Sequence, residues 1–323
     1  MDRNLALNLV RVTEAAALQS ARFLGRGDKN IADQAAVNGM RKMFDTLSID
    51  GVVVIGEGEM DEAPMLYIGE QIGKATDKSI KLDIAVDPLD GTVAVAKGLS
   101  NAISVVAVAP RGCLLHAPDM YMNKIAAGPK AAGKVSLDAP IEKNLINLSK
   151  ALNKNISDIT VAMLDRPRHV EMMKKVRKAG ARIKLFQDGD VAMAIATCFE
   201  DSGVDMLLGI GGAPEGVLAA AALKCLGGEF QGRLHPMKEE EKIRCREMGL
   251  CDVDGLLTIE DLAKGKEIVF SATGVSNGEF LKGVVYYENN MAKTYSVVMR
   301  AETGTVRFVE AIHRLDKKPE YAR

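Results

Sequence analysis

Hydrophobic residues recur every three or four positions through the first part of the chain, which is the spacing of one face of a helix. This pattern predicts a first helix over residues 5–23, ended by Gly25. A second helix is predicted to begin after Asp28, whose side chain can accept hydrogen bonds from the first turn, and to reach Leu47. A third helix is expected over residues 64–73.

Short continuous apolar runs without helical spacing predict buried strands. In the first half of the chain they lie at residues 52–55, 80–86, 102–109 and 121–127. Glycine and proline occur together between residues 128 and 140, a composition typical of a domain boundary. The chain is therefore expected to form two domains, a metal-binding domain over residues 1–135 and a substrate-binding domain over residues 136–323.

After this boundary strands and helices alternate, which is typical of an α/β fold. Strands are predicted at residues 159–164, 183–186 and 204–210, and helices at residues 141–152, 170–179, 191–198 and 217–226. The last part of the chain is richer in strands, which are predicted at residues 266–273, 295–300 and 306–313.

The composition is that of a globular protein with a large core, since 47% of the 323 residues are hydrophobic and 26% are charged. The net charge is −1 and tryptophan is absent, so nucleic acid is not an expected partner. No apolar run approaches the ~20 residues that span a bilayer, and the N-terminus has no signal-peptide core, so no membrane partner is expected. The five scattered cysteines are expected to be reduced thiols of a cytoplasmic protein.

Residues 87–92 have the sequence Asp-Pro-Leu-Asp-Gly-Thr and form the most informative motif of the chain. Two carboxylates and a hydroxyl follow a predicted strand, and Mg²⁺ and Mn²⁺ prefer oxygen ligands of this kind. Pro88 cannot donate to a sheet, so the strand is predicted to end at Asp87. Asp-Pro and Asp-Gly are also common turn dipeptides, and a plain strand-to-turn junction is the alternative interpretation.

Three further acidic segments follow predicted strands: residues 57–62, residues 188–190, and Glu215 after two glycines. Asp33 adds a carboxylate in the first turns of the second helix. Each is a weak signal alone, because acids near the start of a helix also stabilise its dipole. Together with residues 87–92 they indicate one shared cleft at the strand ends, with a bound cation.

Cationic side chains for a phosphate group are also present. Arg166 and Arg168 follow the strand predicted over residues 159–164 and suit bidentate phosphate binding. Lys29, Arg26 and Arg233 are further candidates, although a solvated surface charge is the commoner role of a single Lys or Arg. The four histidines are far apart in the sequence and in no metal-ligand spacing, so each is expected to be structural.

Taken together, these motifs resemble those of the lithium-sensitive, metal-dependent sugar and inositol phosphatase superfamily. More closely, the chain is similar to the class II fructose-1,6-bisphosphatases of the GlpX type. The resemblance covers nearly the whole chain and is carried by long runs at residues 25–30, 55–67, 87–92, 117–122, 211–216 and 270–274. It implies a layered αβαβα arrangement of the sugar-phosphatase type, with two α/β domains and the active site in the cleft between them.

The resemblance also implies roles for individual residues. Asp33 and Glu57 would bind one Mn²⁺ or Mg²⁺ ion, and a second ion would be bound by Asp87, Asp90 and Glu215. Some family members carry Glu at the position of Asp90. The implied catalytic residues are Asp61 and Thr92, and Lys29 is a candidate phosphate contact. The implied contacts of the sugar phosphate are Asp90, Gly91, Thr92, Tyr121, Arg166, Pro167, Arg168, Asp188, Gly189, Asp190 and Gly212.

The function implied by the resemblance is metal-dependent hydrolysis of the 1-phosphate of D-fructose 1,6-bisphosphate, which gives fructose 6-phosphate and phosphate. This is a reaction of gluconeogenesis, here expected of a cytoplasmic homo-oligomer, a dimer or a tetramer. One alternative is a phosphatase for sedoheptulose 1,7-bisphosphate or for another sugar or inositol phosphate. Another is a non-catalytic regulator that binds a sugar phosphate, and the intact set of acids that could activate water speaks against it.

Overall fold

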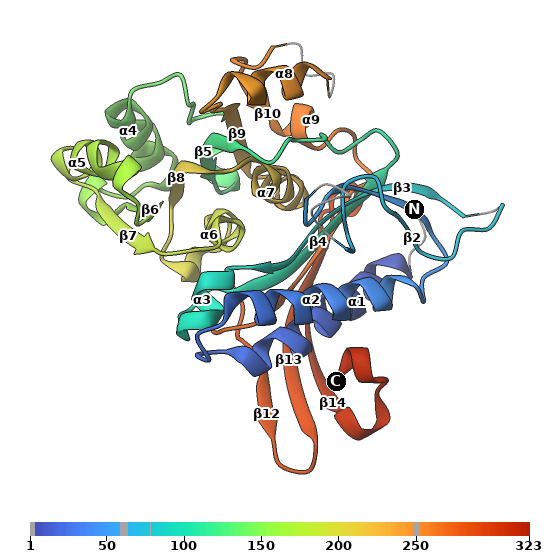
Figure 1. Cartoon of the computed structure of the whole chain (residues 1–323). Helices are drawn as coiled ribbons and strands as arrows, with labels where there is room; N and C mark the ends of the chain where they lie inside the picture. The colour runs from blue at the N-terminus through green and yellow to red at the C-terminus, as the bar shows by residue number, and fades with distance from the viewer. Residues whose placement is uncertain (1–3, 59–63, 78, 248–251) are drawn as a thin grey trace. The chain divides into compact units, whose positions relative to one another are not determined.

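The computed structural model describes residues 4–58, 64–77, 79–247 and 252–323. Within these ranges the chain forms a mixed α/β structure of two compact units (Figure 1). Unit 1 comprises Met1–Leu114 and Gly265–Arg323, and unit 2 comprises Leu115–Lys264. None of the helices in the described ranges has the length and apolar content that crossing a bilayer requires.

Unit 1 is built on one sheet, in which the described strands follow the order β12-β13-β11-β4-β3-β1-β2, with β14 paired to β13. The neighbours β1 and β3 run parallel, and the other pairs are antiparallel. The strands are β1 (Asp50–Ile55), β2 (Gln71–Ile72), β3 (Lys81–Asp90), β4 (Ile103–Pro110), β11 (Val269–Gly274), β12 (Val285–Tyr287), β13 (Met291–Arg300) and β14 (Thr305–Arg314).

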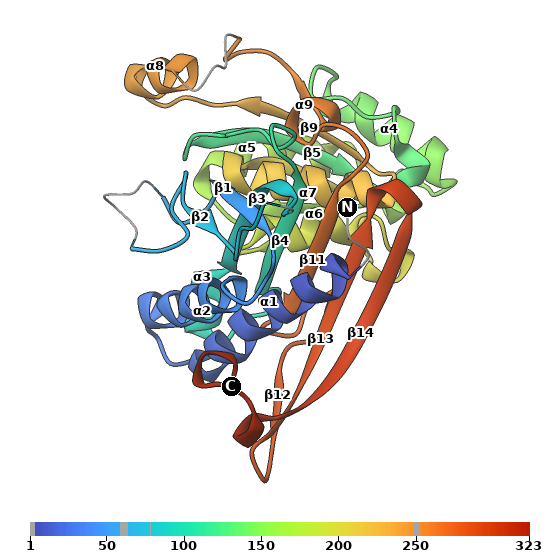
Figure 2. The same cartoon turned by 90° about the vertical axis from the view of Figure 1, so that its right-hand side faces the viewer.

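Two long helices, α1 (Leu5–Ser20) and α2 (Lys29–Phe44), lie side by side and pack against this sheet (Figure 2). Their apolar faces meet the strands in a core that includes the fully buried side chains of Leu9 and Phe44. The two predicted helices are thereby confirmed, and Leu47 lies just beyond the end of the second. The shorter helical segments of unit 1 are η1 (Ala21–Phe23), α3 (Thr92–Lys97), η6 (Ala301–Thr303), η7 (Leu315–Lys317) and η8 (Glu320–Ala322).

The predicted cap of the second helix is present. Asp28 Oδ1 accepts hydrogen bonds from the backbone N–H groups of Asn30 at 3.0 Å and Ile31 at 3.1 Å. These are two of the donors that the first turn of a helix cannot satisfy internally. The cap therefore fixes where α2 begins, and with it the position of Asp33 one turn later.

The helix predicted over residues 64–73 is wrong. The chain bends and turns there, and β2 pairs with β1. Gly69 (φ +92°) and Gly73 (φ +93°) adopt left-handed backbone conformations, which end a right-handed helix. The Glu70 carboxylate accepts a hydrogen bond from the Leu66 N–H and pairs with the Arg41 guanidinium at 2.6 Å, so a polar network takes the place of helical hydrogen bonds.

The prediction that the strand before the Asp-Pro motif ends at Asp87 is also wrong, because β3 continues to Asp90. Asp87 pairs with Val105 and Asp90 pairs with Ile103, so β3 uses three residue steps where β4 uses two. One extra residue in one strand is a β-bulge. Pro88 lies within this bulge, where the missing backbone N–H interrupts no regular ladder.

The last strands of the chain belong to unit 1 rather than to a separate C-terminal domain. β11 pairs with β4 along its whole length, from Val269 opposite Val108 to Gly274 opposite Ile103. The compact units therefore differ from the expected domains at residues 1–135 and 136–323. The reason is that hydrophobic periodicity identifies a strand but does not say which sheet the strand joins.

Unit 2 contains a second sheet with the strand order β10-β9-β5-β8-β6-β7 in the described residues. The alternation predicted between residues 141 and 226 is confirmed. The strands are β5 (Tyr121–Ala127), β6 (Thr160–Leu164), β7 (Arg182–Phe186), β8 (Met206–Gly212), β9 (Glu229–Leu234) and β10 (Leu257–Thr258). The helices are α4 (Ile141–Leu152), α5 (Val170–Lys178), α6 (Asp190–Ala196), α7 (Ala213–Leu226), α8 (Glu239–Glu247) and α9 (Ile259–Leu262), with η2 (Pro129–Ala131), η3 (Ile156–Asp158), η4 (Pro167–His169) and η5 (Glu200–Ser202).

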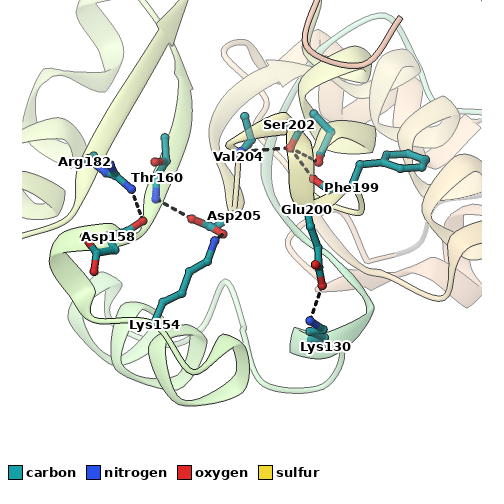
Figure 3. A network of polar contacts seen from close by, with 11 residues as sticks. Lys130, Lys154, Asp158, Thr160, Arg182, Phe199, Glu200, Ser202, Val204 and Asp205 are labelled. Atoms are coloured by element: carbon teal, nitrogen blue, oxygen red, sulfur yellow. Dashed lines mark hydrogen bonds and ion pairs between the residues drawn. The ribbon is translucent and has the colours of Figure 1, made fainter.

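A buried carboxylate ties the beginnings of β6 and β8 together (Figure 3). Asp205 Oδ2 accepts from the Thr160 N–H at 2.9 Å, and the Asp205 N–H donates to the Thr160 carbonyl at 2.9 Å. Asp205 Oδ1 pairs with Lys154 Nζ at 2.7 Å. The two parallel strands therefore leave this point in a fixed register.

Unit 1 buries a polar network between α1, β13 and β14. The Thr294 hydroxyl donates to Glu14 Oε1 at 3.1 Å and lies 2.7 Å from His313 Nε2. Burial lowers the pKa of His313 to about 4, and the positive charge of Lys318 acts in the same direction. Burial also raises the pKa of Glu14. Both side chains are thus pushed towards their neutral forms.

His313 should make the protein less stable in acid. The unfolded chain takes up the histidine proton at about pH 6.5, whereas the folded chain does so only near pH 4. The contribution of neutral His313 to the free energy of unfolding is therefore complete well above pH 6.5. It is lost as the pH falls towards 4, by about 2 kcal/mol at pH 5. Urea unfolding at pH 7.5 and pH 5 measures this loss.

Because its pKa is raised, Glu14 contributes more stability as the pH falls, which opposes the effect of His313. Glu14 is present in both the natural protein and His313→Gln, so the comparison between these two proteins isolates His313. His313→Gln should lose less stability between pH 7.5 and pH 5 than the natural protein. His116→Gln, which changes an exposed histidine, should keep the natural pH dependence. An equal pH dependence in His313→Gln and the natural protein would contradict this account.

Candidate active site

The parallel pair β1 and β3 places two predicted site residues at one edge of the unit 1 sheet. Ile55, the last residue of β1, pairs with Ala85 of β3, and Glu57 and Asp87 each lie two residues further along the chain. The carboxyl ends of neighbouring parallel strands emerge at the same edge, so Glu57 and Asp87 lie at the same edge of the sheet. Both side chains are half-buried.

Asp33 joins this edge from the first turns of α2, where its side chain shares a hydrogen bond with Glu57. Burial raises the pKa of Asp33, and the positive charge of Lys29 and the hydrogen bond to Glu57 act against it. Two half-buried carboxyl groups this close repel each other when both are ionised. A bound cation removes that repulsion, so the arrangement of Asp33 and Glu57 fits a divalent metal ion.

The bulge in β3 lies between the other two predicted acids of this unit, Asp87 and Asp90. Asp87 Oδ1 accepts from the Leu89 N–H at 3.0 Å, which fixes the first carboxylate, and Asp90 is 4% exposed. Gly91 follows with φ +108° and directly precedes α3, which begins at Thr92. A Cβ atom at Gly91 would stand only 3.1 Å from Ala102 Cα, and the positive φ would strain any larger residue at this turn.

Unit 2 contains a buried ion pair on its own sheet. Lys124 of β5 is 1% exposed, and its Nζ lies 3.0 Å and 2.7 Å from the two carboxylate oxygens of Asp190. A Cβ atom at Gly211 would collide with Asp190 Oδ2, so the glycine makes room for the carboxylate. Asp190 was predicted as a substrate contact, and the structure adds a partner for its side chain inside the protein.

Glu215 stands in the first turn of α7, after Gly212 at the end of β8. Its Oε2 is buried and accepts no hydrogen bond from the described residues. Burial raises the pKa of Glu215, the positive charge of Lys124 opposes this, and the Asp190 carboxylate acts in the same direction as burial. A buried carboxylate oxygen without a donor also fits a cation ligand. A Cβ atom at Gly212 would collide with this oxygen.

The predicted phosphate contacts of unit 2 form two pairs. The Arg168 guanidinium lies 4.7 Å from the centre of the Tyr121 ring, and Tyr121 pairs with Gly212 across β5 and β8. Arg166 Nη2 lies 4.0 Å from an oxygen of Asp188. Pro167 shares η4 with Arg168, and Gly189 (φ +74°) precedes Asp190 at the start of α6. Tyr121 and Arg168 are exposed and accessible to a ligand.

The structure does not test every predicted role. Asp61 lies outside the described residues, and in the described part of the chain no three Asp, Glu, His or Cys side chains are grouped closely enough to hold a metal ion. The ligand roles of Asp33, Glu57, Asp87, Asp90 and Glu215 therefore stay predictions.

Sequence reasoning missed the buried Lys124 beside the predicted site, and it gave His169 a structural role without any partner. Lys124 gave a signal that could have been used, because it is a lone cation in the strand Tyr121–Ala127 whose following residues are apolar. A charged residue at such a position requires an opposite charge inside the fold. His169 gave no such signal, since its partners are backbone groups.

Comparison with known proteins identifies the family. The sequence model described as bacterial fructose-1,6-bisphosphatase, glpX-encoded, matches residues 3–313. The chain is 46% identical to "Fructose-1,6-bisphosphatase 1 class 2" of Escherichia coli (strain K12), over 98% of this chain and 97% of the relative. It is 45% identical, with the same coverage, to "D-fructose 1,6-bisphosphatase class 2/sedoheptulose 1,7-bisphosphatase" of Synechococcus sp. (strain JA-3-3Ab).

The chain belongs to the family of bacterial, glpX-encoded fructose-1,6-bisphosphatases. The resemblance inferred from the motifs is thereby confirmed, and with it the expectation that the protein is an enzyme of the class II fructose-1,6-bisphosphatase type with a mixed α/β fold. A family of metal-dependent phosphatases also accounts for the half-buried acids of unit 1 and for the buried Glu215 carboxylate, which would otherwise be unfavourable.

Lys124→Met should destabilise the protein strongly. The change leaves the Asp190 carboxylate buried without its counter-charge, which costs about 3–5 kcal/mol in comparable sites. The double variant Lys124→Met/Asp190→Leu should recover much of that loss, because both buried charges are then removed. The test is the free energy of unfolding in urea, measured for the natural protein, Lys124→Met and the double variant.

Lys130→Met is the matched control. Lys130 pairs with Glu200 on the surface of unit 2, and both side chains are exposed (Figure 3). Solvent screens such a pair, so its loss should change stability little. If Lys124→Met were as mild as Lys130→Met, the buried ion pair would not have the importance assigned to it here.

Proposed function

We propose that this enzyme releases the 1-phosphate of D-fructose 1,6-bisphosphate by a metal-dependent reaction, with Asp33, Glu57, Asp87, Asp90 and Glu215 as the metal ligands. The observation that carries the proposal is the carboxylate edge at the ends of β1 and β3, in a chain of this family. Mn²⁺ and Mg²⁺ are the proposed ions, because the side chains offer only oxygen ligands.

A divalent ion bound there supplies a nucleophilic water at neutral pH and neutralises charge on the phosphoryl group. The residues of the chain have the remaining tasks. Thr92, at the start of α3, and Asp61 are proposed to orient the attacking water and accept its proton. Gly91 gives the substrate close access to the backbone, since it carries no Cβ.

The phosphate remote from the reacting ester is proposed to bind Arg166, Arg168 and Tyr121 in unit 2. Arg168 Nε and Nη2 donate to the Ile210 carbonyl at 3.1 Å and 2.7 Å, which fixes the plane of the guanidinium. The opposite edge of that plane then faces the ligand with a set geometry. Binding energy from this remote group orients the reacting end of the sugar.

Sedoheptulose 1,7-bisphosphate is the second candidate substrate. The printed name of the Synechococcus relative includes sedoheptulose 1,7-bisphosphatase. The two sugars share a ketose 1-phosphate and a remote phosphate, so the same carboxylates and arginines serve both. Gluconeogenesis, a cytoplasmic location and a homo-oligomeric state stay predictions from the resemblance.

Asp87→Ala should abolish metal-dependent phosphate release and leave the fold intact. We expect kcat to fall by about 10³-fold or more, because the metal ion both generates the nucleophile and stabilises charge. Circular dichroism and the melting temperature should be close to those of the natural enzyme. Asp77→Ala, at an exposed position of unit 1, should keep natural activity. Near-normal turnover by Asp87→Ala would reject the proposed site.

Phosphate release identifies the substrate and the ion. With Mn²⁺ or Mg²⁺ present, fructose 1,6-bisphosphate should give fructose 6-phosphate as the only sugar product, and fructose 6-phosphate should not react further. Sedoheptulose 1,7-bisphosphate should be turned over at a comparable kcat/KM, and inositol phosphates should not be. Binding of fructose 1,6-bisphosphate without turnover under every ion would favour a non-catalytic regulator instead.

A further inference from the structure

His169 lies at the end of η4, next to Arg168 in the sequence, and its side chain is fully buried. The Ile210 N–H donates to His169 Nε2 at 2.7 Å, and His169 Nδ1 lies 2.7 Å from the Leu164 carbonyl. A backbone N–H can only donate, so Nε2 is the acceptor and Nδ1 carries the hydrogen. The imidazole is therefore neutral and bridges two strands through both of its nitrogens.

This bridge lies where β6 and β8 stop pairing directly. Their direct register consists of Val161 opposite Met206 and Ala162 opposite Leu207, and further along the imidazole joins Leu164 to Ile210. Gly209 lies against the ring, and a Cβ atom there would stand 3.1 Å from Nε2. The histidine thus substitutes for a stretch of backbone ladder at the carboxyl ends of the two strands.

Arg168 and His169, which are consecutive in the chain, each hold one of the two peptide groups that flank Ile210. The Ile210 N–H donates to His169 Nε2, and the Ile210 carbonyl accepts from Nε and Nη2 of Arg168. The carbonyl that orients the guanidinium is therefore itself oriented by the imidazole. Burial lowers the pKa of His169, and the charges of Arg168 and Arg166 act in the same direction, which keeps this acceptor available at neutral pH.

We propose that His169 is a positioning residue that sets the Arg168 guanidinium for the substrate phosphate remote from the reacting ester. The inference rests on the proposed function, in which Arg168 binds that phosphate. His169 itself touches no reacting atom. Without its hydrogen bond the Ile210 backbone shifts, Arg168 loses its anchor, and the remote phosphate meets a misplaced cation.

The test is His169→Phe, which removes both hydrogen bonds of the imidazole and keeps an aromatic ring at this position. We expect KM for fructose 1,6-bisphosphate to rise by about tenfold to a hundredfold, the loss of affinity that a weakened hydrogen bond to a charged group produces. The inhibition constant of fructose 6-phosphate, which carries the remote phosphate, should rise by the same factor, and kcat should change less than KM. His169→Gln, which can donate and accept at once, should lie between His169→Phe and the natural enzyme.

Two comparisons make the result specific. The ratio of kcat/KM for fructose 1,6-bisphosphate to that for fructose 1-phosphate should fall in His169→Phe, because the second substrate has no remote phosphate. The same ratio should fall in Arg168→Ala, and the double variant should lose no more than Arg168→Ala alone, since both changes disable one contact. His116→Gln, at an exposed histidine, controls for loss of an imidazole.

The outcomes separate this inference from the proposed function. If Arg168→Ala leaves the ratio unchanged, Arg168 does not bind the remote phosphate and the proposed function of that residue fails. If Arg168→Ala lowers the ratio and His169→Phe does not, only the positioning role of His169 is overturned. A His169→Phe protein that lowers kcat/KM equally for both substrates has lost general structure, which also overturns it. Should His169→Phe fail to fold, His169→Gln decides by the same ratio.

Discussion

A carboxylate removed from water requires a positive partner or a proton, and both units of this protein are organised around that requirement. In unit 2 the Asp190 carboxylate receives both its hydrogen bonds from the buried Lys124 ammonium. In unit 1 Asp33 and Glu57 share a hydrogen bond, which requires a proton on one of the two carboxyl groups, and ionisation of both would require a cation. Unit 2 thus meets the requirement with an internal ammonium group, and unit 1 meets it with a shared proton that the proposed metal ion would replace.

Close approach of backbone and side chain explains why glycines accompany these acids. A side chain at Gly211 or Gly212 would collide with Asp190 or Glu215, and one at Gly91 would crowd Ala102. Asp190 and Glu215 each stand beside a glycine because a carboxylate packed against a main chain needs the volume of a missing Cβ. The acid-and-glycine motifs of the sequence are therefore packing requirements as well as chemical signals.

The sequence allowed the helices of residues 5–44 and the alternation of residues 141–226 to be predicted, because amphipathic spacing and capping are local. It did not allow the strand pairing to be predicted. β11 joins β4 across about 160 residues of chain, and Pro88 is tolerated in β3 only because of a bulge opposite β4. The candidate acids were visible as motifs. Their supports were not, since Lys124 and His169 are defined by partners from distant segments.

His169 illustrates why an exposed cation needs a neutral support. In its proposed role Arg168 stays in solvent to meet a phosphate, and solvent alone would leave its long side chain in many rotamers. A lysine or arginine in the place of His169 could only donate, and its burial would cost several kcal/mol. A neutral imidazole donates to Leu164 and accepts from Ile210 at once, so it can be buried without a counter-charge. The order of the proposed phosphate site would therefore originate in the uncharged hydrogen-bonded bridge that His169 forms between Leu164 and Ile210.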